Sequence, residues 1–160
     1  MEIDLLFREL YLPLRRYLHR FTGDADAAED AAQEAFVRLA QDSRQIEQPK
    51  AWLYTTALNL VRDSARSSRR RERLLTMNPV RPAELPPADE EVMRADSARR
   101  VREVLERLSL RDRQLLLMRE EGFRHVEMAA AVGVATGSVG TLLARAGKRF
   151  AELYGTPEEV

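Results

Sequence analysis

The residues in this sequence whose types and spacing suit chemistry are mostly arginines. Polar and basic side chains recur along Lys50–Leu75, KAWLYTTALNLVRDSARSSRRRERLL. At about 3.6 residues per turn they fall on one broad face of a helix: Asn59, Arg62, Arg66, Arg69, Arg70 and Arg73. Guanidinium groups in such a row match nucleic-acid phosphates and predict salt-dependent binding. Cations at a helix C-terminus also complement the helix dipole, so the run alone leaves two interpretations open.

Aromatic residues accompany this basic face. Trp52 and Tyr54 lie near its start, and aromatic rings beside arginines can stack on unpaired bases. A single tryptophan at the start of an amphipathic helix is more often part of the core. The polar loop Asp42–Pro49 before the helix could hold an extruded base, although loops of this composition are common. The sequence does not decide between these uses.

A second candidate site lies in Glu127–Phe150, EMAAAVGVATGSVGTLLARAGKRF. Its small, turn and apolar residues have the spacing of a helix-turn-helix: Ala129, Gly133, Val134, Val139 and Leu142 or Leu143. Gly133 supplies the turn residue that can adopt a positive φ. An ordinary helical hairpin shares this pattern and is the alternative. The helix that would enter DNA, from Thr136 to Ala144, has no charged side chain.

The composition argues against catalytic chemistry. The chain has no cysteine and only 2 histidines, which are far apart in the sequence. These counts exclude disulfides and thiolate-held clusters and argue against a metal site. No group of histidine, serine or paired carboxylates stands where a pocket can be argued. We therefore expect neither an enzyme nor a cofactor.

The elements that position these sites are predicted to be helices. Apolar residues recur at helical spacing through almost the whole chain, and no stretch alternates convincingly with period two, so the sequence predicts an all-α fold. The pattern breaks at Thr76–Glu91, TMNPVRPAELPPADEE, where four prolines within nine residues deny both helix and strand. We expect a flexible, proline-rich acidic linker between two small helical domains, of which the second contains the helix-turn-helix. Ser109 and Asp112 predict the start of a helix over Arg111–Glu120, which Gly122 stops.

Charge is sorted into blocks along a chain whose formal net charge is zero. Residues 1–42 carry 5 basic and 9 acidic side chains, 43–75 carry 8 and 3, 76–98 carry 2 and 5, and 99–160 carry 11 and 9. Such blocks offer different faces to different partners, one of them polyanionic, although charged helical surfaces are also common. No apolar run approaches the roughly 20 residues that span a bilayer, and Met1–Arg20 does not resemble a signal peptide. We expect a cytoplasmic protein without membrane insertion.

An acidic helix is predicted over Asp24–Gln41, DADAAEDAAQEAFVRLAQ. Carboxylates near a helix N-terminus are favoured by the dipole alone. The functional interpretation is a docking face for a basic partner. Because carboxylates repel phosphate, this partner is expected to be a protein.

Three segments in this order resemble the extracytoplasmic-function sigma factors of bacterial RNA polymerase, which keep only the second and fourth conserved sigma regions. Ala28–Leu39, AEDAAQEAFVRL, resembles the motif that binds the polymerase clamp. Lys50–Arg71 resembles the helix that melts the promoter and reads its minus-ten element, and Leu108–Phe150 resembles the region that reads the minus-thirty-five element. The resemblance implies sigma region 2 over residues 1–75, a linker over 76–97 and sigma region 4 over 98–155.

The resemblance also implies roles for single residues. Those that face the clamp helices of the largest polymerase subunit would be Asp30, Gln33, Glu34, Phe36 and Arg38. Those at the minus-ten element would be Trp52, Asn59, Arg62, Asp63, Arg66, Arg69 and Arg70. Trp52 would be largely structural, and the loop Asp42–Gln48 would hold a flipped base. The linker would thread through the polymerase without folding.

In the fourth region the chain departs from the family. Where the family usually has a serine or threonine and two basic residues, this chain has Ala135, Gly140 and Leu142. An arginine or lysine that grips guanine, the commonest specific contact, is therefore missing. Short hydrogen bonds and phosphate contacts remain, which predicts a reading of DNA shape more than of bases. The candidate residues are Arg124, Thr136, Ser138, Gly140, Thr141, Arg145, Lys148 and Arg149.

The expected function is that of a sigma factor that binds the β and β′ subunits of core RNA polymerase, recognises a bipartite promoter and helps open it. An anti-sigma protein is a further partner that the family allows. Two alternatives stay open. A polymerase-independent regulator would bind a palindrome as a dimer, but the tail AELYGTPEEV is short for a self-association helix. A sigma-like helical adaptor would bind proteins only, which the neutral recognition helix favours.

Overall fold

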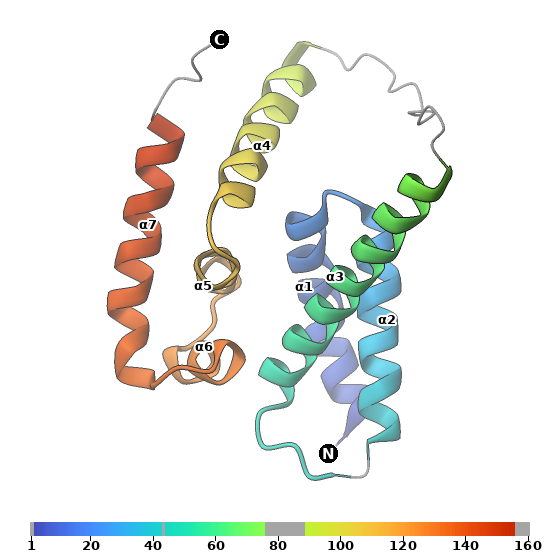
Figure 1. The fold of residues 1–160 in the computed structure, drawn as a ribbon. Helices are drawn as coiled ribbons and strands as arrows, with labels where there is room; N and C mark the ends of the chain where they lie inside the picture. The colour runs from blue at the N-terminus through green and yellow to red at the C-terminus, as the bar shows by residue number, and fades with distance from the viewer. Residues whose placement is uncertain (1, 43, 76–88, 156–160) are drawn as a thin grey trace.

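The computed structural model of the chain describes residues 2–42, 44–75 and 89–155, with the backbone alone for 66–75 and 89–94. These residues form α-helices and one 3-10 turn, and this part of the chain contains no strand, which confirms the all-α prediction (Figure 1). In chain order the elements are α1 (Ile3–Thr22), α2 (Ala25–Gln41), α3 (Pro49–Leu75), α4 (Asp89–Arg107), α5 (Leu110–Glu120), α6 (His125–Val132), the 3-10 turn η1 (Thr136–Ser138) and α7 (Val139–Gly155).

Two adjacent caps fold α2 back along α1. Helix α1 ends where Gly23 adopts a φ of 68°, a conformation that favours glycine, and the Gly23 N–H donates to the His19 carbonyl at 2.8 Å. Asp24 then starts α2, because its Oδ1 accepts hydrogen bonds from the N–H groups of Asp26 and Ala27 at 3.0 and 3.1 Å. The chain therefore reverses within two residues, and α2 returns beside α1 (Figure 1).

The first three helices share an apolar core. Helix α2 contributes the small residues Ala28, Ala32 and Ala35, all fully buried, which let its neighbours approach closely. Helices α1 and α3 contribute larger buried side chains: Leu14, Tyr17, Leu18, Leu53, Tyr54 and Leu58. Burial of one such leucine contributes roughly 1.5–3 kcal/mol. Polar residues on the other sides of α2 and α3 are exposed, among them Asp30, Glu34, Asn59 and Arg62.

The last four helices form a second unit. The Ser109 Oγ accepts a hydrogen bond from the Asp112 N–H at 3.2 Å, so α5 begins with the predicted cap. Apolar residues of α5, α6 and α7 fill the space between them: Leu115, Met118, Met128, Val139 and Leu143. The three helices of this small core hold the helix-turn-helix.

Part of the segment predicted as linker is helical. Helix α4 begins at Asp89, inside the segment 76–97 that was assigned to the linker. All four prolines precede this point, the last being Pro87, so nothing in 89–97 prevents a helix. Residues 76–88, which hold the prolines, lie outside the described residues.

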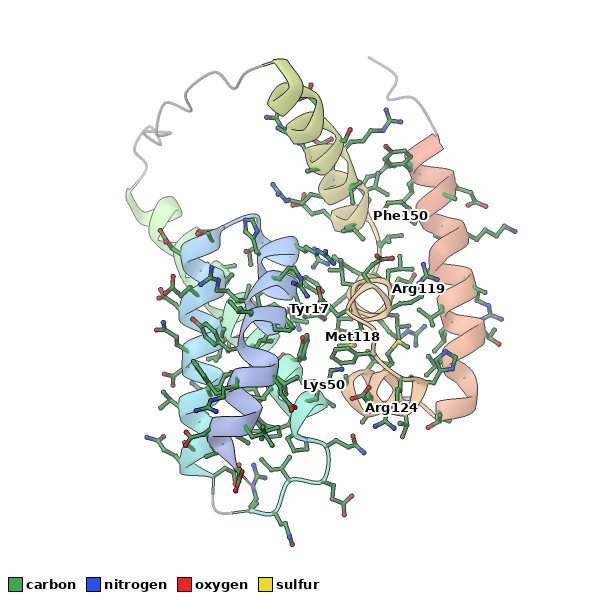
Figure 2. The ribbon with its side chains drawn as sticks, turned by 180° about the vertical axis from the view of Figure 1, so that it is seen from behind. Tyr17, Lys50, Met118, Arg119, Arg124 and Phe150 are labelled. Atoms are coloured by element: carbon green, nitrogen blue, oxygen red, sulfur yellow. The ribbon has the colours of Figure 1, made fainter. Side chains whose placement is uncertain are left out.

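The two units lie against each other, which the sequence analysis did not predict. Helix α6 lies beside the N-terminal part of α3, and α5 meets α1 (Figures 1 and 2). Buried apolar residues of both units form one continuous cluster, in which the rings of Tyr54 and Phe123 meet edge-on with centroids 4.6 Å apart. A description of two domains joined only by a linker is therefore incomplete.

Candidate nucleic-acid interface

The polar face of α3 is exposed as predicted from its periodicity. Asn59, Arg62 and Asp63 are exposed, whereas the neighbouring Leu58 and Val61 are buried in the core. The side chains of the further candidates Arg66, Arg69 and Arg70 lie outside the described part, although their backbone continues α3. The described face carries hydrogen-bonding groups and one guanidinium, which suits contact with bases and phosphates.

The aromatic residues near this face are structural. Trp52 is half-buried and packs against the core. Tyr54 is fully buried, and its ring lies 4.8 Å from that of Tyr17, centroid to centroid. Burial raises the pKa of the Tyr54 hydroxyl well above its usual range. Neither ring is presented to a base in this structure, so the core interpretation of Trp52 is favoured and stacking by Tyr54 is excluded in this form.

The loop before α3 is ordered at its start by one ion pair. Arg44 donates from its backbone N–H, Nε and Nη2 to the Asp42 carboxylate at 2.9, 3.1 and 2.7 Å. These hydrogen bonds lower the pKa of the Asp42 carboxyl to about 2. Ile46 is half-buried against the core and fixes the middle of the loop. Ser43 lies outside the described residues.

The acidic face of α2 is exposed with one exception. Asp30, Gln33, Glu34 and Arg38 are all exposed, and Arg38 Nε donates to Glu34 Oε1 at 3.1 Å. Phe36, which was expected to face a partner, is 5% exposed. It faces inward because it lies on the same helix side as the buried alanines, so it supports this face from within.

Two exposed apolar residues lie at this acidic face. Val37, 47% exposed, follows Asp30, Gln33 and Glu34 on the same side of α2, and Phe7 of α1 is 43% exposed. Leu5 and Leu12, 52% and 62% exposed, lie on the side of α1 that faces away from the core. The Phe7 ring rests edge-on against that of Phe36, with centroids 5.2 Å apart. Exposed apolar side chains next to carboxylates are typical of a protein-binding surface.

The second unit contains a helix-turn-helix built as predicted. Gly133 ends α6 with a φ of 74°, and its N–H donates to the Ala129 carbonyl at 2.9 Å. The Val134 N–H donates to the same carbonyl at 3.1 Å. Ala129 and Val139 are buried where the two helices meet. The recognition helix differs from expectation only at its start, because η1 precedes α7.

The neutral start of the recognition helix is open to solvent. The exposed candidates are Thr136, Ser138, Gly140, Thr141, Arg145 and Lys148. The other two candidate cations are exposed and held in ion pairs: Arg124 Nε lies 3.5 Å from Glu127 Oε1, and Arg149 Nη1 lies 2.9 Å from Asp112 Oδ2. Three hydroxyl-bearing residues and two unpaired cations, judged within the described ranges, therefore lie along this surface.

Glu127 links this helix pair to the first unit. Burial alone would raise the pKa of the Glu127 carboxyl, but the hydrogen bond from the Arg124 N–H at 2.8 Å and the charges of Lys50 and Arg124 lower it overall. The carboxylate therefore stays ionised at neutral pH. In the sequence, Lys50 is only the start of the basic run; its contact with Glu127 depends on the tertiary fold.

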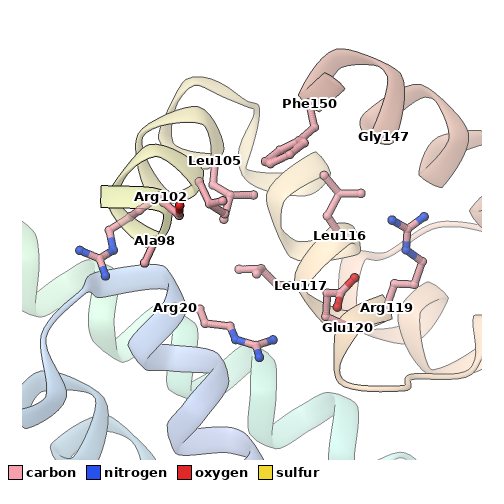
Figure 3. A pocket seen from close by; sticks show the side chains of 12 residues that line it. Arg20, Ala98, Arg102, Leu105, Leu116, Leu117, Arg119, Glu120, Gly147 and Phe150 are labelled. Carbon is pink, nitrogen blue, oxygen red and sulfur yellow. The ribbon is translucent and has the colours of Figure 1, made fainter. Parts of the chain in front are cut away.

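A pocket of about 550 Å³ opens between α4, α5 and α7 (Figure 3). Leu105, Leu116 and Phe150 contribute apolar lining, and Arg20 of α1 lies at its edge. None of the predicted nucleic-acid-binding residues lines this pocket. Its lining also includes Arg102, Arg119 and Glu120. The exposed polar faces of α3 and the helix-turn-helix form the candidate interface.

Metal and membrane sites find no support in the described parts of the chain. No group of three or more histidine, cysteine, aspartate or glutamate side chains there could hold a metal ion. No single described helix is long and apolar enough to cross a membrane. Helix α6 together with Thr136–Gly155 reaches the required length and apolarity, but the pair is bent by 104° at its break.

Comparison with known proteins identifies the family. The family model for Sigma-70 region 2 matches residues 6–71, and the model for Sigma-70, region 4 matches residues 98–150. A Mycobacterium tuberculosis protein named ECF RNA polymerase sigma factor SigL is 41% identical over 68 residues, which are 40% of this chain and 38% of that protein. The chain belongs to the extracytoplasmic-function sigma factors.

Two other proteins named as sigma factors match more of the chain. A Xanthomonas campestris protein named Probable RNA polymerase sigma factor RfaY is 33% identical over 135 residues, 78% of this chain and 33% of that protein. The chain thus spans less than half of the curated sigma factors that it matches. The sigma factor RpoE from Bartonella quintana, solved in complex with the anti-sigma factor NepR, shares the fold with a TM-score of 0.60 and 23% identity, over 97% of this chain and 98% of that one.

Proposed function

We propose that this chain is a sigma factor that binds core RNA polymerase through its β and β′ subunits, directs it to promoters and helps open them. Residues 1–75 would act as region 2, residues 98–155 as region 4, and residues 76–97 would connect them, with the first turns of α4 included. The observation that carries this proposal is the presence, on one chain and in this order, of the two matched regions. Each region has an exposed polar face on its nucleic-acid-reading helix.

Region 2 would provide the polymerase contact through α2 and the minus-ten contact through α3. The exposed residues of α2 would face the clamp, with the apolar Phe7 and Val37 adding contact area. Asn59, Arg62 and Asp63 would face the minus-ten element, together with Arg66, Arg69 and Arg70. Trp52 would act from the core by fixing the position of α3.

Region 4 would read the minus-thirty-five element mainly through DNA shape. Thr136, Ser138 and Thr141 can offer short hydrogen bonds, and Gly140 allows close approach of the backbone. Arg124, Arg145, Lys148 and Arg149 would contact phosphates on either side. Without a guanidinium at the centre of the helix, sequence discrimination would rest mostly on region 2.

The proposed role is that of a binding protein that acts in the cytoplasm, where the polymerase carries out the chemistry. An anti-sigma protein is a proposed further partner, since the structurally similar RpoE was solved in complex with NepR. It would act by holding the chain away from the polymerase.

Run-off transcription tests the proposal directly. Core polymerase is incubated with this chain and fragmented genomic DNA of its source, and the 5′ ends of transcripts are mapped. New start sites that share upstream elements are expected. Intact polymerase binding without new starts would contradict the proposal and would instead support a sigma-like adaptor.

A further inference from the structure

The first turns of the recognition helix have no strong donor of their own for a base. No side chain from Thr136 to Ala144 is charged, and Gly140, which is exposed near the start of α7, has no side chain. The next cations along α7 are Arg145 and Lys148, about 7.5 and about 12 Å beyond Gly140 along the helix axis. A strong donor to a base near Gly140 must therefore come from another element.

His125, the first residue of α6, borders the open space at Gly140. A Cβ on residue 140 would lie 3.9 Å from the His125 Cε1, which is an ordinary van der Waals contact. The His125 side chain is exposed. Among the described residues, none supplies a hydrogen-bond or ion-pair partner to its ring nitrogens. Both nitrogens are therefore free to meet a ligand that approaches α7.

The packing of α6 against α7 holds the imidazole in this place. Met128 and Ala129 follow His125 by three and four residues, so the three lie on the same side of α6. Met128 and Ala129 are buried, whereas His125 continues this side beyond the core. The ring thus lies beside α7 because its helix is anchored by its next turn.

The neighbouring guanidiniums are partly engaged in the fold. Arg124 Nε lies 3.5 Å from Glu127 Oε1. Arg149 Nη1 donates to Asp112 Oδ2 at 2.9 Å. Each arginine has one nitrogen committed to a carboxylate of its own unit, which restricts where the remaining donors can point. His125 has no such commitment.

An imidazole at this surface suits the edge of a guanine. A neutral imidazole donates from one ring nitrogen, and an imidazolium donates from both. Guanine presents two acceptors in the major groove, N7 and O6, and this groove admits an α-helix. A helix-turn-helix places its second helix there. A donor beside Gly140 would then face base edges, because no side chain on residue 140 stands between the ring and the groove.

We propose that His125 is a base-reading residue of the helix-turn-helix, whose imidazole donates to N7 or O6 of a guanine in duplex DNA from beside Gly140. This inference rests on the proposed DNA binding by region 4. It adds one base contact to the shape reading proposed for that region. The contact comes from α6, the helix that precedes the recognition helix.

NMR of the imidazole rings in the full chain tests the contact. The sequence has 2 histidines, and His19, exposed on α1, serves as the internal reference. Short random-sequence DNA duplexes are titrated into the chain at about 0.05 M salt, where phosphate contacts are strong. The His125 ring signals should shift together with the amides of Thr136 and Thr141, while those of His19 stay in place. Unshifted His125 signals would overturn the inference, whether or not the amides shift.

Selection of duplexes from a random pool by the full chain tests the base preference. The native chain should enrich guanine at one position, and His125→Ala should reduce this preference at least about fivefold. His125→Gln should move the preference toward adenine, because glutamine pairs with adenine N6 and N7. No enrichment of guanine by the native chain, or an unchanged preference in His125→Ala, would overturn the inference.

Further variants separate base reading from folding. Adding Gly140→Arg to His125→Ala should restore the guanine preference, because arginine pairs with O6 and N7. A persistent loss would indicate a damaged recognition helix and would overturn the inference. Arg145→Ala should weaken binding to all duplexes alike, as loss of a phosphate contact does, and His19→Gln should change nothing; loss of the guanine preference in either would also overturn it.

These measurements are independent of the proposed sigma factor activity. They use the free chain and DNA without polymerase. Failure of run-off transcription together with shifted His125 signals would therefore count against the proposed function alone. New start sites together with unshifted His125 signals would count against the role of His125 alone.

Discussion

Arg149 of α7 donates a hydrogen bond to Asp112 of α5 across 2.9 Å, and the Asp112 side chain is 4% exposed while that of Arg149 is 63% exposed. The pair fastens the recognition helix to the helix beneath it. Arg149 was expected only as a phosphate contact, yet one of its donors is committed to holding the fold.

Removing this pair should lower stability. Arg149→Ala leaves the buried carboxylate without its partner and should reduce the free energy of unfolding by about 1–3 kcal/mol. Lys148→Ala, at the adjacent exposed position, should change it by less than about 0.5 kcal/mol, although both should weaken DNA binding by the holoenzyme. Chemical denaturation measures the difference. Equal stability of the two variants would show that the hydrogen bond contributes nothing.

Phe36 and Val37 are neighbours in sequence with opposite environments, 5% and 47% exposed. Phe36→Ala should lower the free energy of unfolding by about 3–5 kcal/mol because it leaves a cavity in the core. Val37→Ala should leave stability nearly unchanged and weaken binding to core polymerase. Thermal unfolding and polymerase affinity are measured for both. Unchanged affinity in Val37→Ala would remove this residue from the proposed clamp contact.

The Asp24 carboxylate starts α2 by accepting two backbone hydrogen bonds. Asp24→Ala should cost about 1 kcal/mol of stability, whereas Asp24→Asn should cost much less because asparagine caps equally well. The comparison is made by urea denaturation monitored by circular dichroism. A loss as large in Asp24→Asn would point to charge instead of the hydrogen bonds.

Asp42 should titrate at an unusually low pH because Arg44 holds its pKa at about 2. A carboxyl whose pKa is lower in the folded chain adds stability above its unfolded pKa of about 3.9. That contribution is lost as the pH falls toward 2. NMR titration of the carboxyl carbon should show this value, and Arg44→Ala should return it toward about 3.9. An unchanged pKa in Arg44→Ala would refute the stated cause.

The polar face of α3 should matter for opening and not for polymerase binding. Arg62→Ala should weaken promoter complexes of all sequences alike and reduce the salt slope by about 1, as loss of a phosphate contact does. Asn59→Ala should impair strand opening, measured by permanganate reactivity. Ser64→Ala, exposed on the same helix, is the control. Loss of polymerase binding with normal opening would reverse the proposed assignment of faces.

Local features were predictable from the sequence because their physical causes are local. The periodicity of apolar residues predicted the helices. Ser109 predicted the start of α5, and Gly133 predicted the turn of the helix-turn-helix. The exposed face at Asn59 and Arg62 followed from the same periodicity. Helix α4 begins at Asp89, within the predicted linker 76–97, because no proline stands between Asp89 and Ser97.

Side-chain environments that depend on distant segments were not predictable in this way. Arg149 is paired with Asp112, a residue 37 positions away in the sequence. No pattern within α7 reports on such a partner. Only the tertiary structure therefore shows which candidate binding residues are exposed and which support the fold.

The sequence by itself determined the helices, the helix-turn-helix and the order of two sigma regions, since these depend on residue spacing and turn chemistry. The tertiary structure alone decided that the two regions close on each other. Arg16 and Glu121 are 105 residues apart, and their attraction depends on proximity and burial that only the folded chain creates.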